Sequence, residues 1–131
     1  MVKNSVWIQQ EICGVKLYVY RSNVQNATTI YFLDGDQFEG PFNHWISKHQ
    51  PPLNFVLLNA NNRTDDYTPW PLQAAETMPM DFGGKAEEHL SFITTHVIPF
   101  CESEYGFASS AEKRVIGGYS LGGLFSLYAA V

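Results

Sequence analysis

Residues 114–124 read RVIGGYSLGGL, and this segment is the clearest indication of the fold in the sequence. Its apolar beginning predicts a short strand over 114–119, and the apolar residues behind it predict a helix over 121–131. The pattern G-x-S-x-G joins the two, which puts Ser120 at a strained turn between the strand and the helix. Gly118 and Gly122 flank the serine because side chains there would collide where strand and helix meet.

A serine at such a turn can act as a catalytic nucleophile, because its hydroxyl is exposed beside the positive end of the following helix. Acyl transfer to serine also needs two N–H groups that bind the developing oxyanion. We expect these from Leu121, directly after the serine, and from Asp36, where Gly35 lets the backbone turn after a strand. The alternatives are a helix-capping serine in a glycine-rich turn and, around Gly35, an ordinary turn.

Strand and helix patterns alternate along the rest of the chain, which we treat as one domain over residues 1–131. Alternation through crossovers predicts a three-layer α/β/α fold with a mostly parallel sheet and an antiparallel opening pair. Pro99 is expected to kink the long helix and Gly106 to end it. The predicted strands are 6–8, 15–20, 28–33, 53–58 and 114–119, and the predicted helices are 42–47, 86–104 and 121–131.

The 131 residues carry 8 Lys and Arg against 13 Asp and Glu, a net charge of −5. No basic stretch is present to neutralise phosphates, so nucleic acid is not an expected partner. No apolar run reaches the length of a membrane span, and the N-terminus lacks the apolar segment of a secretory signal. Cys13 and Cys101 are too few for a disulfide framework, and we expect two reduced thiols, packed as small hydrophobes, in a cytoplasmic protein.

Four segments in sequence order resemble one family: YFLDGD at 31–36, NRTDDYTPWP at 62–71, FITTHVIPF at 92–100, and the stretch at 114–124. They are similar to motifs of the family known as "putative esterase" within the α/β-hydrolases, which includes esterase D and the enterochelin esterases. The resemblance implies a serine hydrolase that cleaves small-molecule carboxylic esters through an acyl-serine intermediate, without a cofactor. An acyltransferase of the same fold and a non-catalytic binding or oligomerising remnant remain the alternatives.

In α/β-hydrolases the nucleophile is followed by an acid and then by a histidine. Residues 121–131 contain neither, so the chain looks like the N-terminal half of the fold, truncated after the nucleophile helix. We expect it to be nearly inactive alone and to associate with itself through the open edge of its sheet. His44, near the loop after the third strand, is the least implausible substitute base. The spacing of His44 and His49 does not favour a metal site, and His89 and His96 are expected to be partly exposed.

The segment 61–84 is long, polar and proline-containing, and a loop of this length is usually either functional or a sign of a secondary-structure element that the pattern does not show. Tyr67 and Trp70 within it are candidates for a substrate entrance. The alternative is a solvated loop that these two aromatic side chains anchor to the domain.

Overall fold

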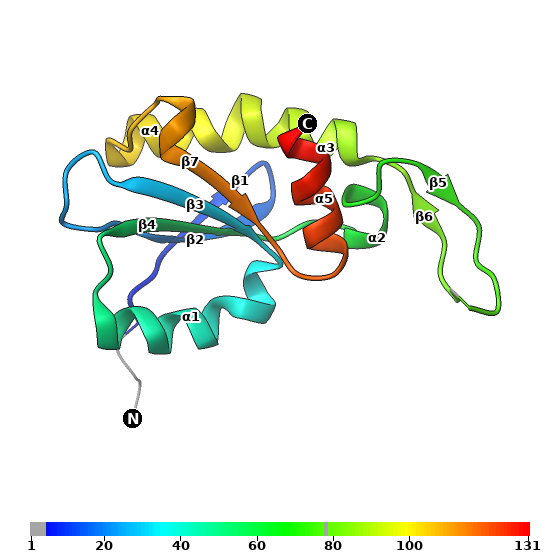
Figure 1. Ribbon diagram of the computed structural model, residues 1–131, viewed down its shortest axis with the longest axis horizontal. Coiled ribbons are helices and arrows are strands. Elements are labelled where there is room, and N and C mark those ends of the chain that lie inside the picture. Colours follow the sequence, from blue (N-terminus) through cyan, green and yellow to red (C-terminus); the bar gives the residue numbers. More distant parts are fainter. Residues whose placement is uncertain (1–4, 78) are drawn as a thin grey trace.

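A five-stranded mixed sheet forms the centre of the computed structural model, which describes residues 5–77 and 79–131 (Figure 1). Its order is β1-β2-β4-β3-β7, in which β3, β4 and β7 are parallel while β1 and β2 run antiparallel at one edge. The parallel sheet and the antiparallel opening pair are therefore confirmed. The strands are β1 (Ile8–Ile12), β2 (Val15–Tyr20), β3 (Thr28–Leu33), β4 (Leu53–Leu58) and β7 (Arg114–Gly117).

Helices cover the two faces of the sheet, which confirms the three-layer α/β/α architecture (Figure 1). Helix α1 (Gly35–His49) covers one face. The other face carries α3 (Ala86–Phe92), the π-helical turn η1 (Ile93–Val97), α4 (Ile98–Tyr105) and α5 (Leu121–Ala130). Short elements complete the chain: α2 (Arg63–Asp66), β5 (Pro71–Leu72), β6 (Phe82–Gly83) and the 3-10 turn η2 (Ala111–Lys113).

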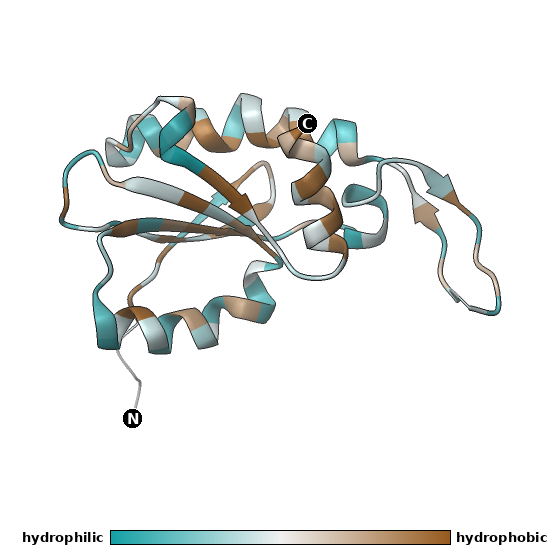
Figure 2. Ribbon diagram, viewed as in Figure 1, coloured by the Kyte–Doolittle hydropathy of each residue, from teal (hydrophilic) through white to brown (hydrophobic). Residues whose placement is uncertain are grey.

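The core has two parts, one on each face of the sheet. Between the sheet and α3, η1, α4 and α5, side chains such as Leu33, Val97 and Phe125 are fully buried. On the other face Ile46 of α1 packs with Leu57 of β4 and its neighbours. The hydropathy colouring shows brown residues along the strands and on α5, with more teal on the outer turns of the other helices (Figure 2).

Helix α1 is longer than the predicted helix over 42–47. Its two glycines and Pro41 lower intrinsic helix propensity, which is why the sequence did not predict the first turns. Packing outweighs propensity here, because the rings of Phe38 and Phe42 lie 5.3 and 5.0 Å from that of Phe32 on β3. Pro41 is exposed, so water can solvate the carbonyl group that this proline leaves without a helical donor.

The long helix predicted over 86–104 is present as α3, η1 and α4. The expected disturbance at Pro99 takes the form of the π-helical turn directly upstream of it, because proline cannot donate to the preceding turn. Gly106 ends α4 in the left-handed conformation, with φ 71° and ψ 26°, as predicted.

Several local predictions were wrong. The first strand is Ile8–Ile12 rather than 6–8, because an edge strand tolerates the polar residues that the hairpin with β2 requires. Strand β7 ends at Gly117, two residues early, where the turn towards α5 begins. Segment 61–84, whose length indicated either a functional loop or an element without a visible pattern, contains α2 and a β5–β6 hairpin. Cys13 is exposed in the β1–β2 turn, while Cys101 is buried as expected.

Candidate active site

Ser120 lies at the corner between β7 and α5 (Figure 1). Its φ of 58° and ψ of −120° fall in a region that residues other than glycine rarely adopt. The N–H of Gly122 donates to the carbonyl of Tyr119 at 3.0 Å, and the N–H of Leu124 donates to that of Ser120 at 3.1 Å. The residue is exposed, and its side chain does not cap the helix. The serine hydroxyl is therefore not used to hold the turn.

Two glycines allow the strand and the helix to meet at this corner. A Cβ atom on Gly118 would lie 2.6 Å from the carbonyl carbon of Gly122, a distance that real Cβ atoms do not adopt. A Cβ atom on Gly122 would lie 3.3 Å from Cβ of Leu33, at the end of β3. This corner over residues 118–122, called the elbow below, thus packs directly against itself and against the neighbouring strand. It has no room for a side chain at Gly118 and only a tight fit for one at Gly122.

The neighbouring corner, between β3 and α1, is built around Asp34. Its backbone is left-handed, with φ 57° and ψ 53°, and its N–H donates to Oη of Tyr67 at 3.2 Å. Nε and Nη2 of Arg63 donate to Oδ1 and Oδ2 of Asp34, each at 3.0 Å. The Asp34 side chain is 9% exposed and that of Arg63 40%. Since a Cβ atom on Gly122 would lie 3.5 Å from Oδ2 of Asp34, this ion pair borders the elbow.

Asp36, whose N–H we expect in the oxyanion hole, lies in the first turn of α1. Its N–H donates to Oδ1 of Asn59 at 2.7 Å, and Nδ2 of Asn59 donates to the carbonyl of Lys16 at 3.3 Å. Its carboxylate accepts a hydrogen bond from Oη of Tyr18 and lies 3.4 Å from Nζ of Lys16. The Tyr18 hydrogen bond, aided by Lys16, lowers the pKa of the Asp36 carboxyl group, so this residue is an anion at neutral pH.

Leu121 is the first residue of α5, so its N–H has no carbonyl group one turn earlier in the helix to which it can donate. The N–H of Asp36, by contrast, is engaged by Asn59 in this structure. An oxyanion could receive both N–H groups only after the Asn59 side chain turns away.

A cavity of about 360 Å³ opens beside these residues, at the edge where the parallel strands end. Asp34, Asp36, Asn59 and Arg63 are among the residues that line it. Its lining combines two carboxylates, amide groups and the guanidinium group of Arg63, which is paired with Asp34, so the cavity is polar and can exchange hydrogen bonds with a ligand. Within the described part of the chain, no group of three His, Cys, Asp or Glu side chains could hold a metal ion.

The four histidines do not form a hydrogen bond with Ser120 in the part of the chain that the structure describes. His44, His49 and His96 are exposed. His89 was expected to be partly exposed but is only 6% exposed, because its ring packs 5.6 Å from that of Tyr67 and 5.1 Å from that of Phe125. Burial lowers the pKa of His89, so its imidazole is neutral at pH 7.

The two residues proposed for a substrate entrance differ in their surroundings. Tyr67 is fully buried and bonded to Asp34, so the prediction that it lines an entrance was wrong. Burial also raises the pKa of its hydroxyl, which stays protonated. Trp70 is 55% exposed, at the base of the β5–β6 hairpin. Its role stays a prediction.

Sequence reasoning did not assign roles to Arg63 and Asn59. Arg63 was part of the segment over 62–71, but its partner lies 29 residues away in the sequence, which no local pattern shows. Asn59 directly follows β4, and a polar residue at the end of a parallel strand is a signal that could have indicated it.

Comparison with known proteins places this geometry in a family. The family described as "Putative esterase" matches residues 9–131. The chain is 32% identical over 106 residues to the uncharacterized protein YbbA of Bacillus subtilis (strain 168), covering 81% of this chain and 41% of that protein.

Two solved structures have a similar fold. The siderophore hydrolase EstA from Aspergillus nidulans matches with a TM-score of 0.68 and 21% identity, over 95% of this chain and 52% of its own. An IroE-like serine hydrolase from Shewanella oneidensis matches with a TM-score of 0.69 and 24% identity, over 88% of this chain and 41% of its own. The chain thus spans about half the length of these relatives or less.

None of the described helices combines the length and the apolar character that crossing a membrane requires. The chain shares its fold with these two solved structures over the part of each that it covers. Because the family match covers nearly the whole sequence, the chain belongs to the esterase family described as "Putative esterase".

Proposed function

We propose that Ser120 is the nucleophile of a hydrolase that cleaves small-molecule carboxylic esters through an acyl-serine intermediate. The observation that carries the proposal is the strained backbone of an exposed serine at the strand–helix corner, with its side chain bonded to no helix N–H. Such strain persists where the surrounding structure enforces it, and it is concentrated at functional sites. The esterase family match supports the reaction class.

In the proposed reaction, Oγ of Ser120 attacks the ester carbonyl carbon while a base removes its proton. The N–H groups of Leu121 and Asp36 hold the oxyanion, the latter after Asn59 releases it. Collapse of the tetrahedral intermediate expels the alcohol, which receives the proton from the base. Water then attacks the acyl-serine, releasing the carboxylic acid and restoring the serine.

The base and the acid of the triad are not among residues 121–131, which contain no Asp, Glu or His. We propose that both come from sequence outside this chain, and that the 131 residues alone have at most residual activity. Loss of a triad member leaves catalysis of about 10³–10⁴-fold over water, from the oxyanion hole and binding. Transfer of the acyl group to an acceptor other than water is the second candidate reaction.

The open side of the sheet supports a second proposal, self-association. Strand β7 is an edge strand, Val115 on it is 45% exposed, and Leu127 on α5 is 67% exposed. Unpaired backbone groups beside apolar side chains favour pairing with another strand.

Two free cysteines are compatible with the cytoplasm, which we propose as the compartment.

The test uses a p-nitrophenyl ester and two forms of the protein. In a complete enzyme that contains this chain, Ser120→Ala should abolish turnover, and mass spectrometry should detect the acylated Ser120 peptide in the unsubstituted enzyme. The 131-residue chain should show almost no turnover and should be larger than a monomer by light scattering. Substantial activity after Ser120→Ala would place the nucleophile elsewhere, and product analysis with added alcohol separates hydrolysis from acyl transfer.

A further inference from the structure

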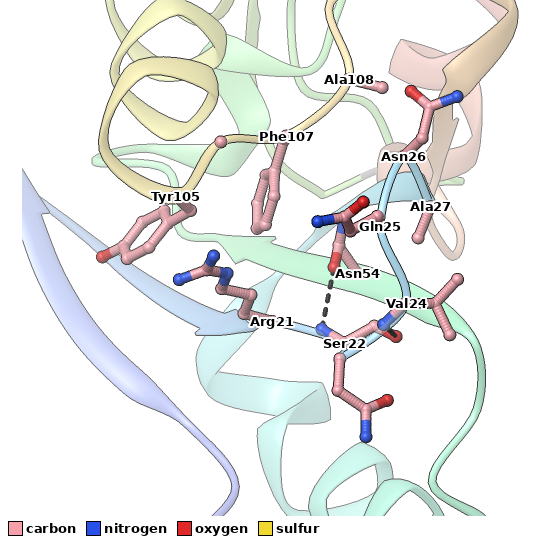
Figure 3. Close-up of a pocket in the computed structure, with 12 residues that line it drawn as sticks. Arg21, Ser22, Val24, Gln25, Asn26, Ala27, Asn54, Tyr105, Phe107 and Ala108 are labelled. Carbon is pink, nitrogen blue, oxygen red and sulfur yellow. Dashed lines mark hydrogen bonds between the residues drawn. The ribbon is translucent and has the colours of Figure 1, made fainter.

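A second cavity, of about 730 Å³, lies away from Ser120, and Figure 3 shows the residues that line it. It is lined by the β2–β3 loop over 21–27, by Asn54 near the start of β4, and by residues 105–108 behind α4. Parallel strands begin at this edge and end at the opposite one, where Ser120 lies. The cavity is therefore separate from the candidate active site.

One guanidinium group supplies the only charge among the lining residues, all of which are described. Arg21 lines the cavity, and no lining residue is acidic. The other two arginines are each held by two hydrogen bonds to a carboxylate, Arg63 by Asp34 and Arg114 by Glu102. Arg21 forms no ion pair with any described residue. The N–H groups of its planar guanidinium group therefore have no carboxylate partner among the described residues, in a protein whose net charge is −5.

Buried hydrogen bonds hold the loop that carries Arg21. The N–H of Ser22 donates to Oδ1 of Asn54 at 2.9 Å, the dashed line in Figure 3. Nδ2 of Asn54 in turn donates to Oγ1 of Thr29 at 3.2 Å, and the N–H of Val24 donates to Oγ of Ser22 at 3.0 Å. Ser22 is 6% and Asn54 3% exposed. This wall of the cavity is pre-formed, which lowers the entropy that a ligand must overcome on binding.

The opposite wall includes Tyr105 and Phe107, which are 8% and 6% exposed and so present little of their surface to the cavity. The rings of Tyr105 and Phe107 lie 5.5 Å apart, and the Arg21 side chain points towards them in Figure 3. The amide side chain of Gln25 also lines the cavity. Amide groups and one cation within a volume typical of small-molecule sites favour an organic ligand over a bare ion.

We propose that this cavity binds a small organic carboxylate, with its two oxygens on the guanidinium group of Arg21 and its body in the cavity between the 21–27 loop and residues 105–108. One guanidinium group matches a single negative charge and the bidentate geometry of a carboxylate. A phosphate dianion would leave a second charge without a partner here. The proposal is independent of the role of Ser120.

The test is a titration of the 131-residue chain with benzoate, followed by ¹H–¹⁵N NMR, with neutral benzamide as the matched probe. Benzoate at millimolar concentration should shift the amide resonances of residues 21–27 and 105–108, and benzamide should not. Arg21→Gln should weaken binding by about tenfold or more, the usual effect of losing a charge-assisted hydrogen-bonded pair. Lys85→Gln, which removes the same charge elsewhere, should leave binding unchanged.

Equal binding of benzamide, unchanged binding after Arg21→Gln, or shifts confined to the elbow would each overturn the proposal. So would the absence of shifts in both lining segments. Arg21 is exposed, so Arg21→Gln should fold, and its unliganded spectrum checks this. Ser120→Ala should bind benzoate as the unsubstituted chain does, which separates this result from the outcome of the esterase test.

Discussion

Two strand-to-helix corners follow adjacent parallel strands. Both contain a residue with a positive φ angle, but the side chains of these two residues have different surroundings. Asp34 follows β3 and Ser120 follows β7, and each adopts a positive φ, 57° and 58°, directly before a helix. A positive φ at a residue other than glycine is a cost that other interactions must offset.

The corners differ in what surrounds the side chain. Asp34 accepts two hydrogen bonds from Arg63, and its N–H reaches Tyr67, so the side chain helps to hold its corner. The Ser120 side chain does not cap its helix, and its corner is held by the contact between Gly118 and Gly122. A corner fixed by backbone packing leaves its side chain available for chemistry, whereas a corner fixed by its own side chain does not.

The largest effect on stability should come from Gly118→Ala, which disrupts the backbone contact between Gly118 and Gly122. The new Cβ atom would lie 2.6 Å from backbone of Gly122, so strand or helix must shift, and the free energy of unfolding should fall by about 3 kcal/mol. Urea denaturation of the isolated chain measures this. Gly40→Ala is the control, since apart from its chain neighbours nothing lies within 4 Å of its Cβ position. It should change stability little, because the gain in helix propensity is opposed by the clash between the new Cβ atom and the ring of Pro41. Equal effects of the two substitutions would contradict the role of backbone packing.

Asp34→Ala should have the next largest effect, because it removes the anchor of the other corner. Arg63 would lose its partner while 40% exposed, so we expect a loss of about 2–3 kcal/mol, less than for a fully buried pair. Asp34→Asn keeps an acceptor and tolerates the left-handed backbone, and it should cost less. A double-mutant cycle with Arg63→Ala measures the coupling, and additive effects would show that the ion pair does not anchor this corner.

A pH-dependent effect should come from His89. Its ring contacts Tyr67, which bonds to Asp34 at one corner, and Phe125 of α5, the helix that follows Ser120 at the other corner. Burial lowers its pKa in the folded state, partly opposed by Asp66, so protonation favours the unfolded chain. Stability should therefore be full above the ordinary histidine pKa of 6.5 and should fall as the pH drops below it. His89→Gln should weaken this dependence, and His96→Gln, at an exposed site, should leave it intact. Denaturation curves from pH 5 to 8 measure the pH dependence of stability for each variant. Identical pH dependence in His89→Gln and His96→Gln would show that His89 is not the group responsible.

The smallest effect concerns the strain at Ser120. Glycine adopts its backbone angles without strain, so Ser120→Gly should stabilise the chain by about 1 kcal/mol after the entropy of the extra glycine is counted. Ser120→Ala keeps the strain and should change stability by less than about 0.5 kcal/mol. Thermal unfolding of the two variants provides the measurement, and a destabilised Ser120→Gly would show that the hydroxyl holds the corner after all.

The fold was predictable where local pattern and tertiary structure agree. The strands over 15–20, 28–33 and 53–58 have the predicted bounds, because dense β-branched and aromatic residues lie between turn residues there. The first turns of α1 were not predictable, since the packing of Phe38 and Phe42 on β3 outweighs the glycines and Pro41. Two-residue strands such as β5 are too short to show a pattern.

For the candidate site, the sequence predicted the backbone of the elbow but not its surroundings. G-x-S-x-G specifies a local turn, and the strained geometry at Ser120 follows from adjacent residues. The bond between Asn59 and Asp36 joins residues 23 apart, and the burial of His89 depends on α5. Contacts of this kind arise from the order of strands in the sheet, which periodicity does not encode.

The π-helical turn over Ile93–Val97 has a consequence for insertions and deletions in related chains. Such a turn accommodates one residue more than an α-helical turn, and each residue rotates a helix by about 100°. Deleting one residue there would convert it into an α-helical turn without turning α4, so Glu102 would stay beside Arg114, the first residue of the strand that leads to Ser120. A relative that is one residue shorter at this turn should therefore keep the pair at 102 and 114, whereas a deletion in α4 before Glu102 would rotate the helix by about 100° and separate the two residues.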